Sequence, residues 1–200
     1  NLDLSKKDGF KILSNDLELY SNLSKERGVD AYGVAFKIND KNVLYKLNEN
    51  PTKIHKRSDF KSFLNNQLNQ KSENFSFIGQ NRLVTNGLKS FNENIQPIIT
   101  ENIIGIHNGI LSNIQKFKNN DAENLKSDSH ILFNFLSEKF NNKENYINQF
   151  LKIIRDINGN FSIALFLQHD DEMFLSSNCG SLYYYYDKNN NFLTFASEKN

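Results

Sequence analysis

The sequence of 200 residues contains one cysteine, two prolines, one methionine and no tryptophan. One cysteine cannot form an internal disulfide framework or a zinc cluster, so neither is expected to hold the fold together. An excess of charge of one sign is also lacking, because 24 Lys and Arg are balanced by 23 Asp and Glu and the net charge is +1. This balance supplies no broad positive field for a polyanion, and we therefore do not expect nucleic acid as a partner.

Long hydrophobic runs are missing as well. No apolar stretch approaches the roughly 20 residues of a membrane-spanning helix. The polar residues 1–7 do not form the apolar segment of a secretory signal. We expect a soluble, cytoplasmic chain without a membrane partner. Because the chain begins with Asn1 and not with methionine, we also expect the natural N-terminus to lie upstream.

Aromatic residues are abundant. Hydrophobic residues make up 38% of the chain and mean hydropathy is −0.61, but 17 Phe and 8 Tyr supply a large apolar area from few positions. A chain of this length buries about 70% of the surface that its unfolded form exposes. We therefore predict that residues 1–200 form a single globular domain.

The hydrophobic pattern predicts helices alternating with pairs of strands. Helical spacing is expected in residues 15–25, 58–70, 129–140 and 146–157. In the first of these helices, Asn15 with Glu18 resembles a capping box, and Leu17, Tyr20 and Leu23 share the apolar face. Strand spacing is expected in residues 31–38, 43–47, 75–79, 161–167, 173–175, 182–186 and 192–196. The first two strands predict a hairpin and the last four an antiparallel meander, with residues 161–167 as a buried central strand. The predicted class is a layered α+β fold, in which helices pack on antiparallel sheets.

Two segments combine polar residues and glycine at strand ends. Residues 79–87 hold Arg82, whose guanidinium could grip a ligand carboxylate or make a surface ion pair. Residues 103–111 carry Asn108-Gly109, which is typical of a tight hairpin turn. The same dipeptide could instead offer the Asn108 amide and the Gly109 N–H as an oxyanion hole. The residues alone leave these alternatives open.

Two further segments lie beside predicted helix ends. Ser127-Asp128-Ser129 precedes a helix, where serine and aspartate are ordinary N-cap residues. Asp128 could also receive the ammonium group of a substrate. Residues 27–30, Arg-Gly-Val-Asp, are typical of a helix C-cap followed by a close backbone approach.

In their order these segments resemble the motifs of class II glutamine amidotransferases. This N-terminal nucleophile family includes the glutaminase domains of glucosamine-6-phosphate synthase and asparagine synthetase. The resemblance covers residues 27–197 and departs from the family pattern at Gln80, Asn81, Leu83 and Gln96. The matching pieces are residues 27–30 (RGxD), 79–87 (GHxRxATxG), 94–97 (NxHP), 106–110 (HNGI), 127–129 (SDxE), 180–184 and 195–198.

The resemblance implies a four-layer αββα sandwich of two antiparallel sheets, the fold of N-terminal nucleophile hydrolases. It implies that Arg82 binds the α-carboxylate of glutamine and that Asp128 binds its α-ammonium group. Asn108 and Gly109 match the oxyanion hole. Such a set suits a zwitterionic amino acid, which needs a cationic fork, an anionic partner and donors at its side-chain carbonyl. The resemblance adds two residues of the substrate loop, Thr85 and Asn86.

The nucleophile of this family is a cysteine at the mature N-terminus, whose α-amino group acts as the base. The chain starts at Asn1 without the cysteine-bearing strand, and we expect it to be inactive as given. Cys179 is interpreted as a cysteine beside a turn or in the core. His107 is expected to pack or to form a hydrogen bond. The four histidines lack metal-ligand spacing, so no metal and no cofactor are expected.

Three functions follow from these observations. The leading hypothesis is a glutaminase that releases ammonia from the side-chain amide of glutamine for a synthase domain or subunit. The alternative is a catalytically inactive amidotransferase-like module that binds glutamine or regulates a partner. The third is an unrelated α+β interaction domain, in which Arg82, Asn108 and Asp128 would lie far apart. The leading hypothesis predicts instead that Arg82, Asn108, Gly109 and Asp128 line one cleft. The sequence predicts neither the ammonia acceptor nor the oligomeric state.

Overall fold

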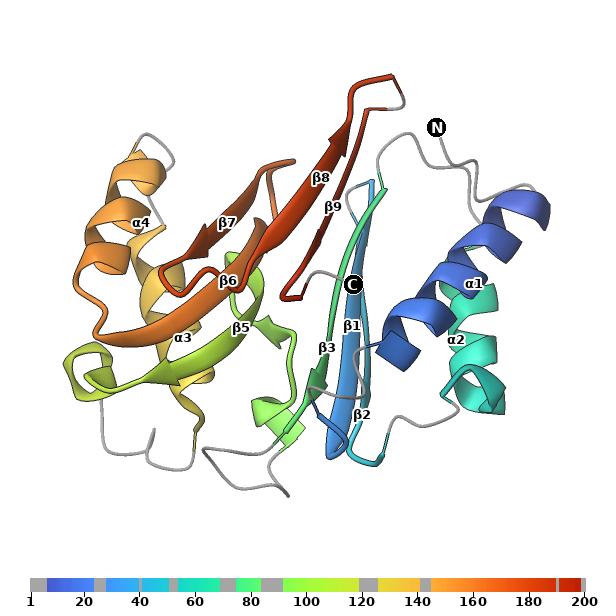
Figure 1. Ribbon diagram of the computed structural model, residues 1–200, viewed down its shortest axis with the longest axis horizontal. Coiled ribbons are helices and arrows are strands. Elements are labelled where there is room, and N and C mark those ends of the chain that lie inside the picture. Colours follow the sequence, from blue (N-terminus) through green and yellow to red (C-terminus); the bar gives the residue numbers. More distant parts are fainter. Residues whose placement is uncertain are drawn as a thin grey trace. The chain divides into compact units, whose positions relative to one another are not determined.

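The computed structural model describes residues 7–23, 28–39, 41–50, 54–68, 75–83, 92–118, 126–140, 145–189 and 191–198, without the side chains of residues 7–10, 12, 55 and 68. The chain divides into two compact units (Figure 1). The first comprises residues 1–85 and 95–97, and the second comprises residues 86–94 and 98–200. Within the described part of the chain, no helix has the length and apolar character needed to cross a membrane.

The first unit is a three-stranded antiparallel sheet with two helices. The strand order is β2-β1-β3, so β1 is central, and each of its residues is buried. The predicted hairpin is confirmed by the β1–β2 pairing, and Asn39 at its turn has a φ of 52°. The elements of this unit are α1 (Lys7–Leu23), β1 (Ala31–Ile38), β2 (Lys41–Leu47), a 3₁₀ helix (Ile54–Lys56), α2 (Ser58–Leu68) and β3 (Phe75–Arg82).

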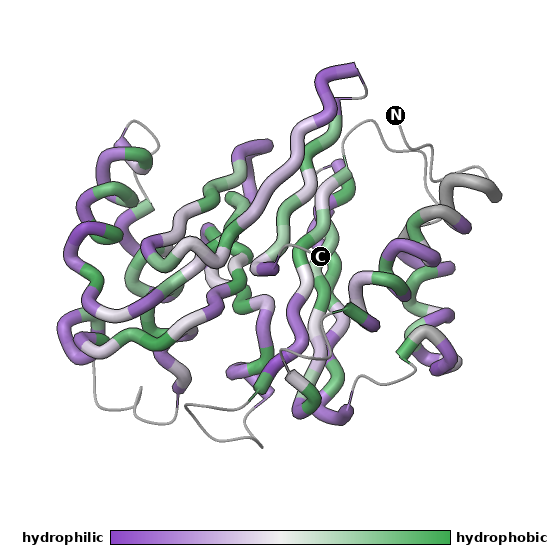
Figure 2. Tube along the Cα trace, viewed as in Figure 1, coloured by the Kyte–Doolittle hydropathy of each residue, from purple (hydrophilic) through white to green (hydrophobic). Residues whose placement is uncertain are grey.

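Aromatic side chains fill much of the core of this unit. Phe36 of β1 is fully buried, and its ring centroid lies 5.9 Å from those of Phe63, Phe75 and Phe77. Large rings bury much apolar area per residue. This explains how a chain with few hydrophobic residues forms a core, and Figure 2 shows the hydrophobic stretches along the strands.

The first helix differs from its sequence prediction at both its start and its buried face. It begins at Lys7 and not near residue 15, so Asn15 is an exposed residue inside the helix and not its cap. The buried stripe consists of Leu13, Leu17 and Ser21, which recur every four residues. Tyr20, expected on the buried face, is exposed. The predicted capping-box pattern was therefore coincidental, because packing of the Leu13–Leu17 face decides where this helix lies.

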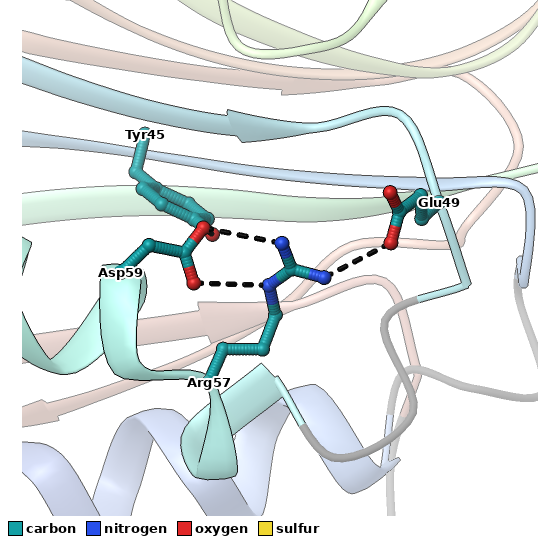
Figure 3. Close-up of polar contacts among 4 residues, drawn as sticks. All are labelled: Tyr45, Glu49, Arg57 and Asp59. Atoms are coloured by element: carbon teal, nitrogen blue, oxygen red, sulfur yellow. Dashed lines mark hydrogen bonds and ion pairs between the residues drawn. The ribbon is translucent and has the colours of Figure 1, made fainter.

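A polar cluster joins β2 to the start of α2 (Figure 3). The Arg57 guanidinium donates to both carboxylate oxygens of Asp59, from Nε at 3.1 Å and from Nη2 at 3.2 Å, and to Glu49 from Nη1 at 2.9 Å. The Tyr45 hydroxyl also donates to Asp59, at 2.9 Å. The bonds from Arg57 are the largest cause of the lowered pKa of Asp59, which lies at about 2. The cluster therefore links β2 to α2 within the first unit.

Replacing Arg57 with alanine is expected to raise the pKa of Asp59 toward the ordinary value near 3.9. The folded-state pKa lies below the unfolded one, so the wild-type interaction stabilises the fold above pH ~4 and is lost as the pH falls toward 2. Carboxyl NMR titration measures the pKa directly. Tyr45→Phe is the matched control, because it keeps the Arg57 fork and should raise the pKa less. An unchanged Asp59 pKa in Arg57→Ala would contradict this cause.

The second unit is built on a four-stranded antiparallel sheet with the order β4-β5-β6-β7. Helices α3 and α4 pack on one face of this sheet, and β8 and β9 form a separate two-stranded sheet. Two short 3₁₀ helices, Asn92–Asn94 and Ile114–Phe117, also belong to this unit. Its other elements are β4 (Ile98–Ile99), β5 (Ile103–Leu111), α3 (Asp128–Lys139), α4 (Tyr146–Arg155), β6 (Gly159–Leu167), β7 (Met173–Ser177), β8 (Tyr183–Asp187) and β9 (Phe192–Ala196).

The central strand of the second unit is the one that the sequence predicted. Residues 161–167 of β6 are all buried, and β6 pairs with β5 on one side and β7 on the other. Phe161, Ile163 and Leu165 face the helices, where they pack with Leu132 and Leu136 of α3. The alternate residues of β6 face the opposite side of the sheet.

The predicted meander does not continue from β7 to β8. Asn178, just after β7, accepts a hydrogen bond from the Phe161 N–H through its side-chain oxygen at 2.8 Å. Its side-chain amide donates to the Gly159 carbonyl, also at 2.8 Å. The Asn178 side chain thus takes the place of a further strand residue beside β6, and the chain turns away at Gly180, where φ is 73°. β8 and β9 therefore pair only with each other in the described residues.

The predicted fold class is confirmed, because each unit combines an antiparallel sheet with two α-helices. Neither unit contains parallel pairing among its described strands. The pattern of paired strands between pairs of helices was sufficient to separate this class from a parallel doubly wound sheet.

Candidate active site

Arg82 lies at the end of β3, beside the start of β1. It pairs with Ala31, and its carbonyl accepts a hydrogen bond from the Asp30 N–H at 2.9 Å. Gly28 approaches the Arg82 backbone so closely that a Cβ atom there would collide with the Arg82 carbonyl group. The Arg82 side chain is 7% exposed, which excludes the interpretation as an ordinary surface arginine. The RGxD-like and GHxRxATxG-like segments therefore meet in the first unit.

Two predicted substrate-loop residues, Thr85 and Asn86, lie outside the described residues, as does Arg27 of the RGxD-like segment. Their predicted roles stay predictions. Arg82 belongs to the first unit, whereas Asn108, Gly109 and Asp128 belong to the second. The prediction that all four line one cleft also stays a prediction.

Asn108 and Gly109 lie inside β5 and do not form a hairpin turn. β5 continues to Leu111 and pairs with β6, with Asn108 opposite Ser162 and Gly109 opposite Phe161. Gly109 has a φ of 143°, and a Cβ atom there would collide with the Asn160 carbonyl. Glycine is required at this position for both reasons. The tight-turn interpretation was wrong because long strand pairing overrides the local preference of Asn-Gly.

The pairing of β5 predicts the side to which the Gly109 N–H points. Successive N–H groups of an antiparallel strand point alternately to its two sides. Ser112 donates to Asn158 on the β6 side, and Leu111 donates to Asp128 on the other side. Strand alternation predicts that the Gly109 N–H points to the same side as the Leu111 N–H. Among the described residues, β4 covers that edge only as far along as Gly105.

The Asn108 side chain lies on the sheet face opposite α3, because the residues of β5 that face the helix are the odd-numbered ones, including Ile103 and Leu111. Asn108 is half-buried, and its amide forms no hydrogen bond with the residues that the structure describes. The Asn108 amide and the Gly109 N–H are both hydrogen-bond donors, and their role as an oxyanion hole stays a prediction.

Asp128 begins α3 and contacts the same edge of β5. Its Oδ2 accepts a hydrogen bond from the Leu111 N–H at 3.1 Å, and its Oδ1 accepts one from the Ser129 N–H at 2.8 Å. Ser127 is the N-cap, because its hydroxyl accepts from the His130 N–H at 3.2 Å. The N-cap interpretation thus holds for Ser127, whereas the carboxylate of Asp128 reaches the strand. The helix N-terminus favours its negative charge.

Sequence reasoning missed Asn94, a residue that holds this segment. Asn94 is fully buried, and its side-chain oxygen accepts a hydrogen bond from the Ser127 N–H at 2.6 Å. It opens the NxHP-like piece, so its position was noticed but its contact was not. A side chain that bonds to the backbone 33 residues away leaves no local pattern in a sequence.

His107 forms a hydrogen bond, as predicted. It is 2% exposed, and its Nδ1 lies 2.8 Å from the Ser129 hydroxyl oxygen. Burial lowers the pKa of His107, and the negative charge of Asp128 opposes this effect. The ring is therefore neutral near pH 7 and is unsuited to act as a charged group there.

Cys179 lies in the turn after β7, and its side chain is exposed. Its Sγ atom lies 3.6 Å from Ser162 Oγ and 3.7 Å from Ser177 Oγ. The hydrogen bond with Ser162 is the largest cause of the lowered pKa of this thiol, which is about 7. The prediction of a cysteine beside a turn is confirmed, and burial is not.

Comparison with known proteins agrees with these motifs. A family model described as a glutamine amidotransferase domain matches residues 80–200, more than half of the chain. No curated protein matches in sequence.

Two solved structures share the fold. The glutamine phosphoribosylpyrophosphate (PRPP) amidotransferase from B. subtilis, complexed with ADP and GMP, is 21% identical with a TM-score of 0.56 over 81% of this chain and 33% of that one. A structure described as the allosteric regulatory enzyme of purine biosynthesis is also 21% identical, with a TM-score of 0.57 over 82% of this chain and 35% of that one. This chain therefore spans about a third of the length of either structure. It belongs to the glutamine amidotransferase domain family, and it shares the fold of these two structures.

Proposed function

We propose that this domain binds free glutamine and hydrolyses its side-chain amide, so that ammonia passes to a synthase domain or subunit. The observation that carries the proposal is the shared edge of β5. Strand alternation directs the Gly109 N–H to this edge, and the Asp128 carboxylate contacts the edge two residues along, at Leu111. Two strand residues span about 7 Å. This separation suits a ligand that carries an amide carbonyl at one end and an ammonium group at the other.

Each proposed site residue has one task in this scheme. The Asn108 amide and the Gly109 N–H stabilise the negative charge that develops on the carbonyl oxygen of the glutamine side chain. Asp128 binds the α-ammonium group, and the buried Arg82 binds the α-carboxylate through its planar fork. Thr85 and Asn86 border the ligand. Two oppositely charged grips select a free amino acid over a peptide or a simple amide.

The reaction needs a thiolate and a base that the site residues do not supply. In this proposal an N-terminal cysteine attacks the amide carbon, and its own α-amino group accepts the thiol proton and returns it to the departing ammonia. A thioester then forms and water hydrolyses it. An amine with a pKa of about 7.7–8.0 is a workable base at neutral pH. Residues 1–200 begin with Asn1, so on their own they are expected to bind glutamine without turnover.

The proposal extends to the organisation of the protein. We propose that residues 1–200 form one domain, which is supported by the likeness to solved structures over 81% of the chain. A cytoplasmic location suits an enzyme whose nucleophile is a free thiol, because reducing compartments keep thiols free.

Glutamine binding tests the two grips. In titration calorimetry with residues 1–200, Asp128→Asn should weaken glutamine binding by roughly 10- to 100-fold, because a charge-assisted contact is lost. It should leave unchanged the affinity for glutaramate, which is glutamine without its α-amino group. Arg82→Lys should weaken glutamine binding in the same way but spare glutaminamide, which lacks the α-carboxylate.

The two variants serve as controls for each other, because each should lose affinity only for ligands that carry the group it binds. Equal losses for every ligand would show that Arg82 and Asp128 act on folding and not on recognition. A wild-type chain that binds glutamate or acetamide as well as it binds glutamine would contradict the proposed substrate.

A further inference from the structure

His107 lies beneath the first turn of α3. Its side chain belongs to the β5 face that packs on this helix, and its Nδ1 lies 2.8 Å from Ser129 Oγ. Ser129 is buried and directly follows Asp128 in the helix. A buried ring from the strand thus contacts the neighbour of the carboxylate that we assign to the ammonium group.

The Asp128 carboxylate is oriented from two sides. Leu111 donates its N–H to Oδ2, and Ser129 donates its N–H to Oδ1. The Ser129 hydroxyl also lies 3.4 Å from Oδ1. A carboxylate has about four lone-pair positions, so these contacts fix its orientation and leave acceptor positions for a ligand. The backbone N–H and the hydroxyl of Ser129 therefore both contact the same carboxylate oxygen.

We propose that His107 is a positioning residue that orients the Asp128 carboxylate through the Ser129 hydroxyl, and thereby sets the selectivity of the domain for ligands with an α-ammonium group. The inference rests on the proposed function, because it assigns the ammonium group to Asp128. It goes further in naming a residue that touches no ligand and yet controls which ligand is accepted.

The proposal assigns a direction to the hydrogen bonds among these three groups. An ionised carboxylate only accepts, so in this arrangement the Ser129 hydroxyl donates to Oδ1 and accepts from His107. His107 is then the donor through Nδ1–H. A neutral imidazole has one N–H, and this chain of bonds places it on Nδ1. The ring, the hydroxyl and the carboxylate form one directed chain from β5 to the start of α3.

A pair of His107 variants separates positioning from packing. Asparagine can place an N–H donor near the position of Nδ1, whereas leucine fills similar space without a donor. In titration calorimetry with residues 1–200, His107→Leu should weaken glutamine binding roughly 10-fold through the loss of a hydrogen bond in a chain that ends on a charge. It should leave glutaramate binding unchanged. His107→Asn should bind glutamine almost as well as the wild type.

A second background tests whether His107 acts through Asp128. In Asp128→Asn, the additional change His107→Leu should cost no further glutamine affinity, because the two residues serve one contact. Ile131→Val is the matched control: it trims the core at the same helix and should alter stability without changing the preference for glutamine over glutaramate. Circular dichroism checks that each variant is folded.

The outcomes distinguish the inference from the function on which it rests. If the wild type does not bind glutamine, the proposed function and the inference both fail. If Asp128→Asn loses ammonium selectivity but His107→Leu does not, only the inference is overturned. Should His107→Leu not fold, long-range ¹H–¹⁵N NMR of the wild type decides: an Nδ1-protonated neutral ring supports the directed chain, and an Nε2-protonated ring overturns it.

Discussion

Residues 1–200 are expected to release no ammonia from glutamine above the uncatalysed background. The proposed site supplies grips and oxyanion donors, but amide hydrolysis by this route requires a thiolate that forms a thioester. Loss of the nucleophile lowers the rate of a hydrolase by a factor on the order of 10⁶. A form that carries an upstream segment beginning with cysteine should release ammonia and glutamate in equal amounts.

The free N-terminus is part of this prediction. If the α-amino group is the base, a form in which one residue precedes the cysteine should bind glutamine normally and turn over far more slowly. Coupled measurement of glutamate and ammonia on all three forms gives the answer. For the active form, kcat/KM should rise with pH as the α-amino group loses its proton. The ordinary pKa of such an amine lies near 7.7–8.0.

Cys179 is the single cysteine in residues 1–200 and therefore the rival thiol nucleophile. Its exposed thiol has a pKa of about 7, so a substantial fraction is thiolate at neutral pH. Turnover by residues 1–200 that Cys179→Ser abolishes would assign the chemistry to this residue and overturn our proposal. Inactivity of the cysteine-led form, with glutamine binding intact, would favour the binding or regulatory module.

The fold was predictable wherever burial follows strand periodicity. The alternation in residues 31–38 and 43–47 predicted a hairpin that forms, and the apolar run at 161–167 predicted a central strand that is buried. Such patterns arise because the side chains on one face of a sheet, or on both faces, are buried away from water. Helices α2, α3 and α4 lie within two residues of their predicted bounds for a similar reason, since their apolar stripes have the helical period.

Local signals failed where tertiary contacts decide. Asn15 with Glu18 resembles a capping box, but the helix that buries Leu13 starts eight residues before Asn15. Asn108-Gly109 resembles a turn, but pairing of β5 with the whole of β6 keeps the chain extended. In both cases a preference of about 1 kcal/mol competes with the burial of several side chains.

The candidate site was predictable only in part. The order of short motifs, which reflects shared chemistry, identified four candidate residues: Arg82, Asp128, Asn108 and Gly109. The order of motifs did not reveal the contacts that hold these residues. Asn94 bonds to Ser127, which lies 33 residues away, and His107 bonds to Ser129, which lies 22 residues away. Both bonds join segments that are distant in the sequence, so no local pattern in a single sequence reveals them.

Replacing Asn108 with alanine in the cysteine-led form is expected to lower kcat by about 10²- to 10³-fold, which is the usual loss for one oxyanion-hole donor. KM should change little. The physical reason is that the Asn108 amide has no partner among the described residues and would gain its full hydrogen bond only when the carbonyl oxygen becomes negative. Steady-state kinetics of glutamate release measures both constants.

Ser162→Ala is the matched control for this prediction. Ser162 lies directly opposite Asn108 in the β5–β6 pair, but its hydroxyl is already bonded to Ser177 at 2.8 Å. Removing the Ser162 hydroxyl should therefore change kcat only a few-fold at most, because this hydroxyl does not stabilise the transition state in the proposed mechanism. If Asn108→Ala instead raised KM and left kcat intact, Asn108 would bind the ground-state amide, and the oxyanion hole would have to be sought elsewhere along β5.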